Sequence, residues 1–179
     1  IITFFHELDA EGKVLSSANI LAPIQRIIIR KIADLSDSIV VSNAKFYDRL
    51  VQINNWINAE IHILPVFSNI GEANSPKSFE EREEALVIFG TVGRREASYS
   101  RLSEDIIKKL SINKIYDIGK DSLRIPRSVS KIVVEKLGEI ESTKVFEILK
   151  KVRFGALSYP ECVLAKSGIL ASYATNGVV

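Results

Sequence analysis

Short β-rich segments alternate with segments of helical periodicity along nearly the whole chain, and this alternation constrains the fold most. Apolar runs such as 1–5 and 38–42 have the length of buried strands. Between them, residues 19–35 place Ile and Leu three or four positions apart, which is the spacing of an amphipathic helix. Strands that alternate with helices are typical of parallel sheets with crossover connections. The sequence therefore predicts an α/β fold.

Further segments extend the same alternation. The predicted strands are 61–66, 86–89, 114–118, 131–137 and 154–157, and the predicted helices are 44–55, 98–110, 141–152 and 166–175. Asn43 is suited to cap helix 44–55, because its side-chain oxygen can accept a hydrogen bond from the first turn. Residues 68–84 interrupt the pattern with Gly, Pro, Ser and Asn and then an acidic run, so they are predicted to be a linker. We therefore expect one domain in residues 1–67 and a second in residues 85–179.

The composition is that of a globular protein. Of the 179 residues, 46% are hydrophobic and 26% are charged, and the net charge of +2 gives no reason to expect nucleic acid as a partner. The single cysteine, Cys162, cannot form an internal disulfide and suits a reducing compartment. The first residues lack the basic segment of a signal peptide. These features predict a cytoplasmic location.

Both ends of the sequence have the composition of strands, and the chain contains no Met. Residues 1–5 and Val178–Val179 are the two β-rich ends. A complete domain rarely begins and ends within a strand, so we expect the chain to be part of a longer protein.

The segment after the predicted strand 86–89 is the strongest candidate for a binding site. Gly90 and Gly93 allow the backbone to turn tightly and to bring amide groups close to a ligand. Arg94 and Arg95 supply planar donors suited to phosphate oxygens, and the N-terminus of the following helix attracts anions. The residues alone fit a diphosphate-binding loop and a solvent-exposed turn equally well. They match neither the Walker P-loop nor the GxGxxG pattern.

Two weaker candidates follow other strands. Residues 158–161 lead into Lys166 and Ser167, which could hold phosphate or sugar hydroxyls, although a capped helix with a solvated lysine explains them better on the residues alone. His6 and Glu7 follow the first strand, where a His beside a carboxylate can act as a base, but such a pair is more often structural. Two His and one Cys are too few ligands for a Cys/His zinc site.

Several segments, taken in order, form a series that is known from one enzyme family. They are FFHEL, SDSIVVSN, IHILPVFSNI, LVIFGTVGRR, KIYDIGK and SYPECVLAKSGILASYATNG. This series, which covers nearly the whole chain, resembles the bacterial GT-B glycosyltransferases and especially their retaining family 4. The resemblance implies a GT-B fold, in which two Rossmann-like parallel-sheet domains face a cleft. Residues 1–67 would be the end of the acceptor-side domain and 85–179 the first part of the donor-binding domain, so both domains are incomplete in this chain.

The resemblance also implies an activity and its partners. It implies transfer of a sugar from a nucleotide-sugar donor to a glycan or small-molecule acceptor, with retention at the anomeric carbon, no bound metal and no other cofactor. Gly93 and Arg94 match the loop that approaches the donor diphosphate, with Arg95 as a substitute for Arg94. A cation there would stabilise the leaving nucleoside diphosphate as the glycosidic bond breaks.

The remaining site residues follow from the same resemblance. His6 matches the end of the acceptor-side strand that faces the cleft, and it is the predicted catalytic residue. Glu161, Lys166 and Ser167 lie near the segment that meets the donor sugar and phosphate. The family habit points to bacterial polysaccharide biosynthesis, and it leaves peripheral attachment to a membrane and the oligomeric state open.

The sequence departs from the family pattern at one place, and this departure leaves two other functions open. Members usually carry paired glutamates in the last segment, and the matching places fall near Leu164 and Ser172, neither of which is acidic. Glu161 is close but out of step. The first alternative is therefore a glycosyltransferase-like protein that binds a nucleotide or a partner without catalysis. A second alternative is a Rossmann-type regulatory or structural module with no sugar chemistry.

Overall fold

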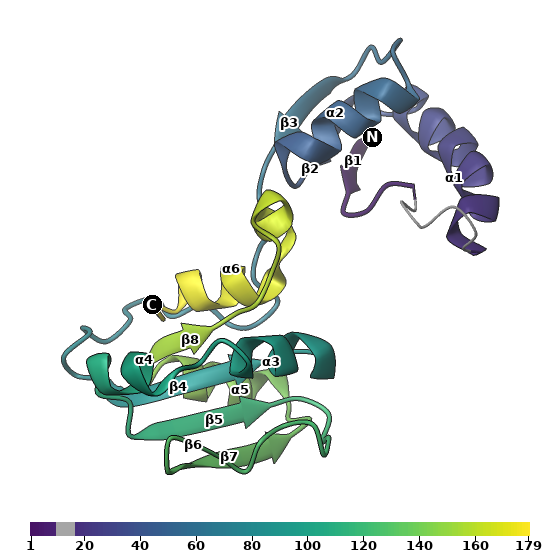
Figure 1. The fold of residues 1–179 in the computed structure, drawn as a ribbon. Helices are drawn as coiled ribbons and strands as arrows, with labels where there is room; N and C mark the ends of the chain where they lie inside the picture. The colour runs from purple at the N-terminus through teal and green to yellow at the C-terminus, as the bar shows by residue number, and fades with distance from the viewer. Residues whose placement is uncertain (10–16) are drawn as a thin grey trace. The chain divides into compact units, whose positions relative to one another are not determined.

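The computed structural model describes residues 1–9 and 17–179, without the side chains of residues 17–20. The chain divides into two compact units, Ile1–Val66 and Phe67–Val179 (Figure 1). Each unit contains a sheet of parallel strands with helical crossovers, so the predicted α/β class is confirmed and is compatible with a Rossmann-like fold. None of the described helices has the length and apolarity needed to cross a bilayer.

The first unit is a three-stranded parallel sheet in the order β1-β2-β3. Its elements are β1 (Ile2–Phe5), α1 (Ser17–Asp34), β2 (Ser38–Val41), α2 (Ala44–Ile53) and β3 (Glu60–Ile63). Asn43 caps α2 as predicted, because its side chain accepts a hydrogen bond from the Phe46 amide at 2.9 Å. Strand side chains such as Phe5 and Ile39 pack in one core with Ile29 of α1 and Leu50 of α2. Both helices therefore contribute to the core on the same face of this sheet.

The second unit has a five-stranded sheet in the order β6-β7-β5-β4-β8. Its strands are β4 (Glu83–Phe89), β5 (Lys114–Ile118), β6 (Ser128–Val129), β7 (Ile132–Gly138) and β8 (Val152–Ala156). Its helices are α3 (Val92–Tyr99), α4 (Glu104–Lys109), α5 (Ser142–Leu149), the 3-10 helix η1 (Glu161–Lys166) and α6 (Gly168–Thr175). All pairs are parallel except β6 with β7. The chain thus builds β4, β5 and β7 in one direction and then returns to place β8 on the free side of β4.

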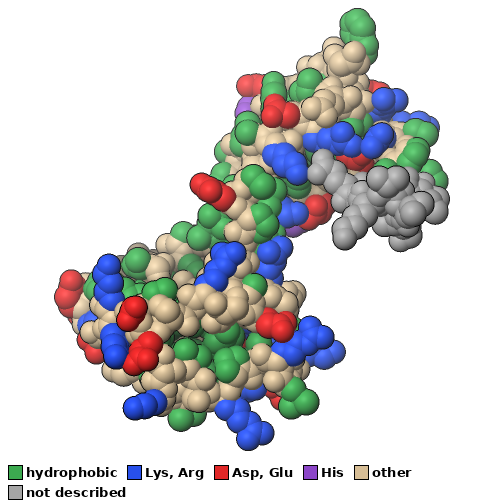
Figure 2. All heavy atoms as spheres, in the orientation of Figure 1, with side chains coloured by type: hydrophobic (Ala, Val, Ile, Leu, Met, Phe, Trp, Pro, Cys, Tyr) green, Lys and Arg blue, Asp and Glu red, His purple; other side chains and the backbone are tan. Residues whose placement is uncertain are grey.

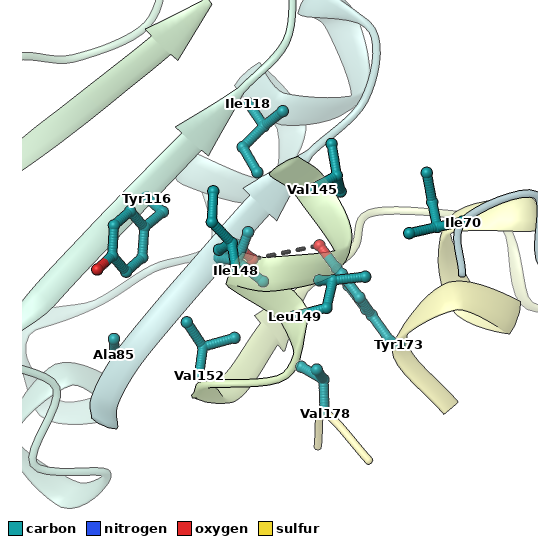
Figure 3. Close-up of a cluster of buried hydrophobic side chains, with 11 residues drawn as sticks. Ile70, Ala85, Tyr116, Ile118, Val145, Ile148, Leu149, Val152, Tyr173 and Val178 are labelled. Atoms are coloured by element: carbon teal, nitrogen blue, oxygen red, sulfur yellow. Dashed lines mark hydrogen bonds between the residues drawn. The ribbon is translucent and has the colours of Figure 1, made fainter. Parts of the chain in front are cut away.

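Alternate residues of β4 enter two separate cores. Val87 packs with α5 and α6 in one core, and Leu86 packs with α3 and α4 in the other. Helices therefore cover both faces of this sheet, as parallel sheets require. Figure 3 shows the first core, where Tyr173 of α6 reaches toward β4 and its hydroxyl donates a hydrogen bond to the Val87 carbonyl at 3.2 Å.

Several boundaries differ from the sequence-based prediction. The single helix predicted over 98–110 is two helices, because α3 already begins at Val92 and Ser103 caps a new helix by accepting from the Ile106 amide. The helix predicted over 166–175 is α6, preceded by η1. Residues 68–84, the predicted linker, belong to the second unit. Ile70 lies in its core, and the buried Arg82 donates to the carbonyls of Lys77 and Asn176.

Charged side chains of both signs are interspersed on the surface. On the visible face of the second unit, in the lower part of Figure 2, Lys and Arg side chains alternate with Asp and Glu. This distribution matches the small net charge of +2.

Candidate functional site

A pocket of about 600 Å³ lies at the carboxyl edge of the second unit's sheet. Its lining comes from the residues that end or follow β4, β5 and β7: Phe89, Gly90, Thr91, Val92, Ile118, Gly119, Lys120, Glu139 and Ile140. The strand order reverses on the other side of β4, between β4 and β8, and ligands of open α/β sheets bind beyond the carboxyl ends of strands near such a reversal. The volume is within the range of sites for small ligands.

Glycines give this edge its shape. Gly90 and Gly119 follow β4 and β5 with φ angles of +132° and +140°, which favour glycine. A Cβ atom on Gly119 would lie 2.3 Å from the Gly90 carbonyl oxygen, so the two loops can approach only without side chains. A Cβ atom on Gly90 would lie 2.7 Å from Ile169 Cδ1, which places the first turn of α6 beside the loop before α3.

Hydrogen bonds continue between the loops beyond the strands. The Gly90 amide donates to the Ile118 carbonyl at 3.1 Å, and the Gly119 amide donates to the Gly138 carbonyl at 2.9 Å. These bonds extend the ladders of β4, β5 and β7 to the pocket. The floor of the pocket is therefore fixed by the sheet itself.

Arg95 lies beneath these loops and is fully buried, at 1% exposure. Its guanidinium forms an ion pair with Asp117 of β5 and donates to the carbonyl oxygen of Lys120. Tyr99 donates to the other oxygen of Asp117 at 3.0 Å. Arg95, predicted as a diphosphate-binding residue in place of Arg94, therefore has a buried guanidinium that already bonds to protein groups, and its binding of a diphosphate stays a prediction.

Burial also shifts the acid-base properties of this network. Desolvation raises the pKa of the Asp117 carboxyl above its ordinary value, although Arg95 and Tyr99 oppose the shift. Desolvation, together with the nearby Asp117, raises the pKa of the Tyr99 hydroxyl, which therefore stays protonated and donates. The network ties α3 to the loop that carries Lys120.

Gly93 and Arg94 lie in the first turn of α3. Gly93 is exposed, and a Cβ atom there would meet no atom within 4 Å. Thr91 occupies the N-cap position without a side-chain hydrogen bond to the helix. The N-terminus of α3, with its partial positive charge, is thus open beside the pocket.

Arg94 is half-buried and turned toward the loop after β8. Its guanidinium lies 4.2 Å from the centre of the Tyr159 ring and donates to the Ser158 carbonyl at 3.4 Å. The Ser158 amide in turn donates to Ser98 of α3 at 3.0 Å. Arg94 therefore lies where the strand order reverses, and it does not line the pocket described above.

The residues predicted near the donor sugar have different environments. Ser167 is buried and caps α6 by accepting a hydrogen bond from the Leu170 amide at 3.2 Å, so its hydroxyl already has a structural partner. Lys166 is half-buried at the end of η1, and Glu161 is exposed at its start. Ser172, at one of the places where the family carries a glutamate, is fully buried and donates to the Gly168 carbonyl at 2.7 Å.

His6 belongs to the first unit and is exposed just after β1. Its ring centre lies 6.3 Å from that of Phe4. Its catalytic role stays a prediction.

Sequence reasoning missed two charged pocket residues, Lys120 and Glu139. They follow β5 and β7, which the sequence separates but the sheet places side by side. The sequence did contain one indication of these two residues, because each directly follows a glycine at a strand end, Gly119 or Gly138. Glycine at such a place lets the backbone approach a ligand closely.

Among the described residues, no group of three or more His, Cys, Asp and Glu side chains is placed to share a metal ion. Comparison of the sequence with models of known protein families gave no match, and no curated protein matched it either.

Proposed function

We propose that the second unit binds the nucleoside diphosphate of a nucleotide-sugar donor and that the protein belongs to a GT-B glycosyltransferase that transfers the sugar to a glycan or other acceptor. The observation that carries this proposal is the position of the pocket. It lies beyond the carboxyl ends of β4, β5 and β7, next to the open N-terminus of α3. Nucleotides occupy this position in Rossmann-like folds because backbone amides and the helix dipole favour phosphate.

The diphosphate is proposed to lie across the first turn of α3. Thr91, Val92 and Gly93 offer backbone amides there, and the absence of a side chain on Gly93 allows close approach. Arg94 supplies a positive charge at the reversal of strand order, where the bond to the sugar would break. A preorganised cation at that place stabilises the negative charge that develops on the leaving diphosphate.

A non-catalytic nucleotide-binding protein is the second candidate. Its support is the buried Ser172, whose hydroxyl bonds to the Gly168 carbonyl where the family carries an acidic residue. Leu164, the other matching place, is also uncharged. Such a protein would retain the diphosphate site and lack transfer.

Calorimetric titration with UDP, GDP, ADP and dTDP tests the donor site. We expect one diphosphate to bind, and Arg94→Ala to weaken it by about 1–3 kcal/mol, as for loss of a charged hydrogen bond. Arg101→Ala, at an exposed position just after α3, is the matched control and should bind as the unchanged protein does. If a folded protein binds none of the four, the donor-site proposal is wrong.

Turnover of the matching nucleotide-sugar separates the two candidates. Release of diphosphate, by transfer or by hydrolysis, supports the enzyme. His6→Ala should then slow turnover without changing the affinity for the diphosphate, because His6 lies outside the unit that holds the nucleotide. Tight binding with no turnover of any donor favours the non-catalytic protein.

A further inference from the structure

The pocket is lined by one positively and one negatively charged side chain that form no hydrogen bond or ion pair with the described residues of the protein. Lys120 and Glu139 line it from the ends of β5 and β7, and both side chains are exposed. In the part of the chain that the structure describes, neither the Lys120 ammonium nor the Glu139 carboxylate has a hydrogen-bond or ion-pair partner. Each group is therefore available to a ligand.

The positions of both residues are held by their backbones. Arg95 donates to the Lys120 carbonyl, and the Gly119 and Gly138 backbones are hydrogen-bonded at 2.9 Å. Glu139 follows Gly138 directly. The backbones that carry the two charged side chains are therefore fixed at neighbouring strand ends, and the side chains themselves are exposed and can adjust.

The rest of the pocket wall suits a flat, apolar group. Phe89 and Ile140, both partly exposed, contribute hydrocarbon surface to the same pocket as the two charged residues. A nucleobase presents apolar faces to such side chains and a polar edge to whatever lies at the rim. The polar edge of a base in this pocket would meet Lys120 and Glu139.

Guanine is the base whose polar edge matches this pair of charges. Its N1–H and N2–H₂ groups donate side by side, as the two oxygens of a carboxylate require, and its O6 accepts from an ammonium. Uracil offers one N–H between two carbonyls, and adenine and cytosine present an acceptor nitrogen that would face the carboxylate. A carboxylate held against an acceptor loses its hydration without gaining a bond.

We propose that Glu139 and Lys120 select guanine, so that the ligand of this pocket is a guanosine diphosphate group. Glu139 accepts from N1–H and N2–H₂, and Lys120 donates to O6. This inference rests on the proposed donor site and narrows it to guanosine diphosphate sugars.

The first test compares GDP, inosine diphosphate, ADP and UDP by calorimetry on the full chain. Inosine diphosphate differs from GDP only by lacking the N2 amine. Because a hydrogen bond to a charged group is lost, we expect GDP to bind roughly ten-fold or more tightly than inosine diphosphate. ADP and UDP should bind more weakly than both. Equal binding of GDP and inosine diphosphate would overturn the role of Glu139.

Glu139→Gln tests the carboxylate directly. The substitution should weaken GDP about ten-fold and reduce the ratio of GDP to inosine diphosphate affinity, because an amide can accept only one of the two bonds. Glu141→Gln, an exposed residue that does not line the pocket, is the control and should leave the ratio unchanged. An unchanged ratio in Glu139→Gln would contradict the proposal.

Lys120→Ala tests the contact with O6. It should weaken GDP and inosine diphosphate to the same degree and leave ADP unaffected, whereas Lys109→Ala at an exposed position of α4 should change none of them. Equal weakening of ADP would show that Lys120 contacts phosphate instead.

The outcomes distinguish this inference from the proposal on which it rests. If UDP, ADP or dTDP binds more tightly than GDP, the donor site stands and the selection of guanine is wrong. If no diphosphate binds, the donor site itself is wrong. Thermal unfolding of each variant confirms that a loss of binding is not a loss of the fold.

Discussion

The two units each bury an aspartate beside arginine side chains, and the pKa values of these two carboxyls shift in opposite directions. In the first unit, Arg26 donates to Asp9 at 2.6 Å and Arg49 at 2.8 Å. The hydrogen bond from Arg49 is the main cause that lowers the pKa of Asp9. In the second unit, burial raises the pKa of Asp117 although Arg95 and Tyr99 both donate to it.

The exposure of the partners explains the difference. The Arg26 and Arg49 side chains are 45% and 24% exposed, so water still solvates the guanidinium groups that hold Asp9. The Arg95 and Asp117 side chains are 0% and 2% exposed, and the second partner of Asp117 is a neutral phenol. Two hydrogen-bonded cations outweigh desolvation at Asp9, whereas at Asp117 desolvation outweighs Arg95 and the smaller effect of Lys136. The contribution of an aspartate–arginine pair to the free energy of unfolding therefore depends on how far its members are removed from water.

The sheets of the two units also differ in how completely helices cover them. The second unit packs helices on both faces of its sheet, whereas the described helices of the first unit both contribute to a core on one face. On the first unit's other face, Phe4 is 39% exposed and Ile2 is 78% exposed. The second unit therefore excludes water from its centre more completely.

Arg95→Ala should change the stability of one unit relative to the other more than any other substitution considered. It removes the guanidinium that pairs with Asp117 and donates to the Lys120 carbonyl, and it leaves a cavity. We expect the second unit to lose about 3–5 kcal/mol of its free energy of unfolding. Hydrogen exchange of β4 and β5 measures this loss within the full chain. Arg101→Ala is the control, and a loss below about 1 kcal/mol in Arg95→Ala would contradict the structural role.

Gly155→Ala tests how tightly the second unit's sheet is covered. A Cβ atom at Gly155 of β8 would lie 2.6 Å from the Tyr173 ring, which is buried in the core of Figure 3. We expect a loss of about 1–3 kcal/mol from overpacking, measured by urea unfolding. Gly93→Ala is the control, because its Cβ would meet open space, and it should be neutral or stabilising by up to about 1 kcal/mol. Equal stability of the two variants would show that Tyr173 can move.

Local patterns predicted the elements but not all of their ends. Strand 114–118 is found as predicted, and Asn43 caps its helix, because both depend on neighbouring residues. The start of α3 at Val92 was missed, since Gly93 reads as a loop residue although it lies in a helical turn. Helix boundaries depend on caps and tertiary contacts as well as on periodicity.

The candidate site could be located only in part. The loop 90–95 was predicted, but the sequence could not show that Arg95 points to Asp117 while Arg94 points to Tyr159. Adjacent helical residues face different directions, so their contacts depend on which face packs on the sheet. Lys120 and Glu139 needed the strand order, which places β5 beside β7.

Asp9→Asn should have a smaller effect, confined to the first unit. The variant keeps the side-chain volume but removes the charge that holds Arg26 and Arg49. Because both arginines are partly hydrated, we expect a loss of about 1–2 kcal/mol. Hydrogen exchange should increase in α1 and α2 and stay unchanged in β4 and β5. Asp48→Asn, at an exposed position of α2, is the control.

The contributions of Asp9 and Asp117 to the pH dependence of stability should have opposite signs, with the smallest effect of the four. The lowered pKa of Asp9 gives stability that is complete above the unfolded value of about 3.9 and is lost as the pH falls through the folded value. The raised pKa of Asp117 contributes stability that is lost as the pH rises from about 3.9 through its folded value, whereas the lowered pKa values of Glu81 and Glu104 in the same unit contribute in the opposite sense. Hydrogen exchange followed from pH 3 upward, corrected for the intrinsic exchange rate, measures both units at once. Asp9→Asn should reduce the loss of stability at low pH in the first unit only, and Asp117→Asn should remove the opposite contribution from the second unit. A dependence that neither substitution changes would contradict the assigned shifts.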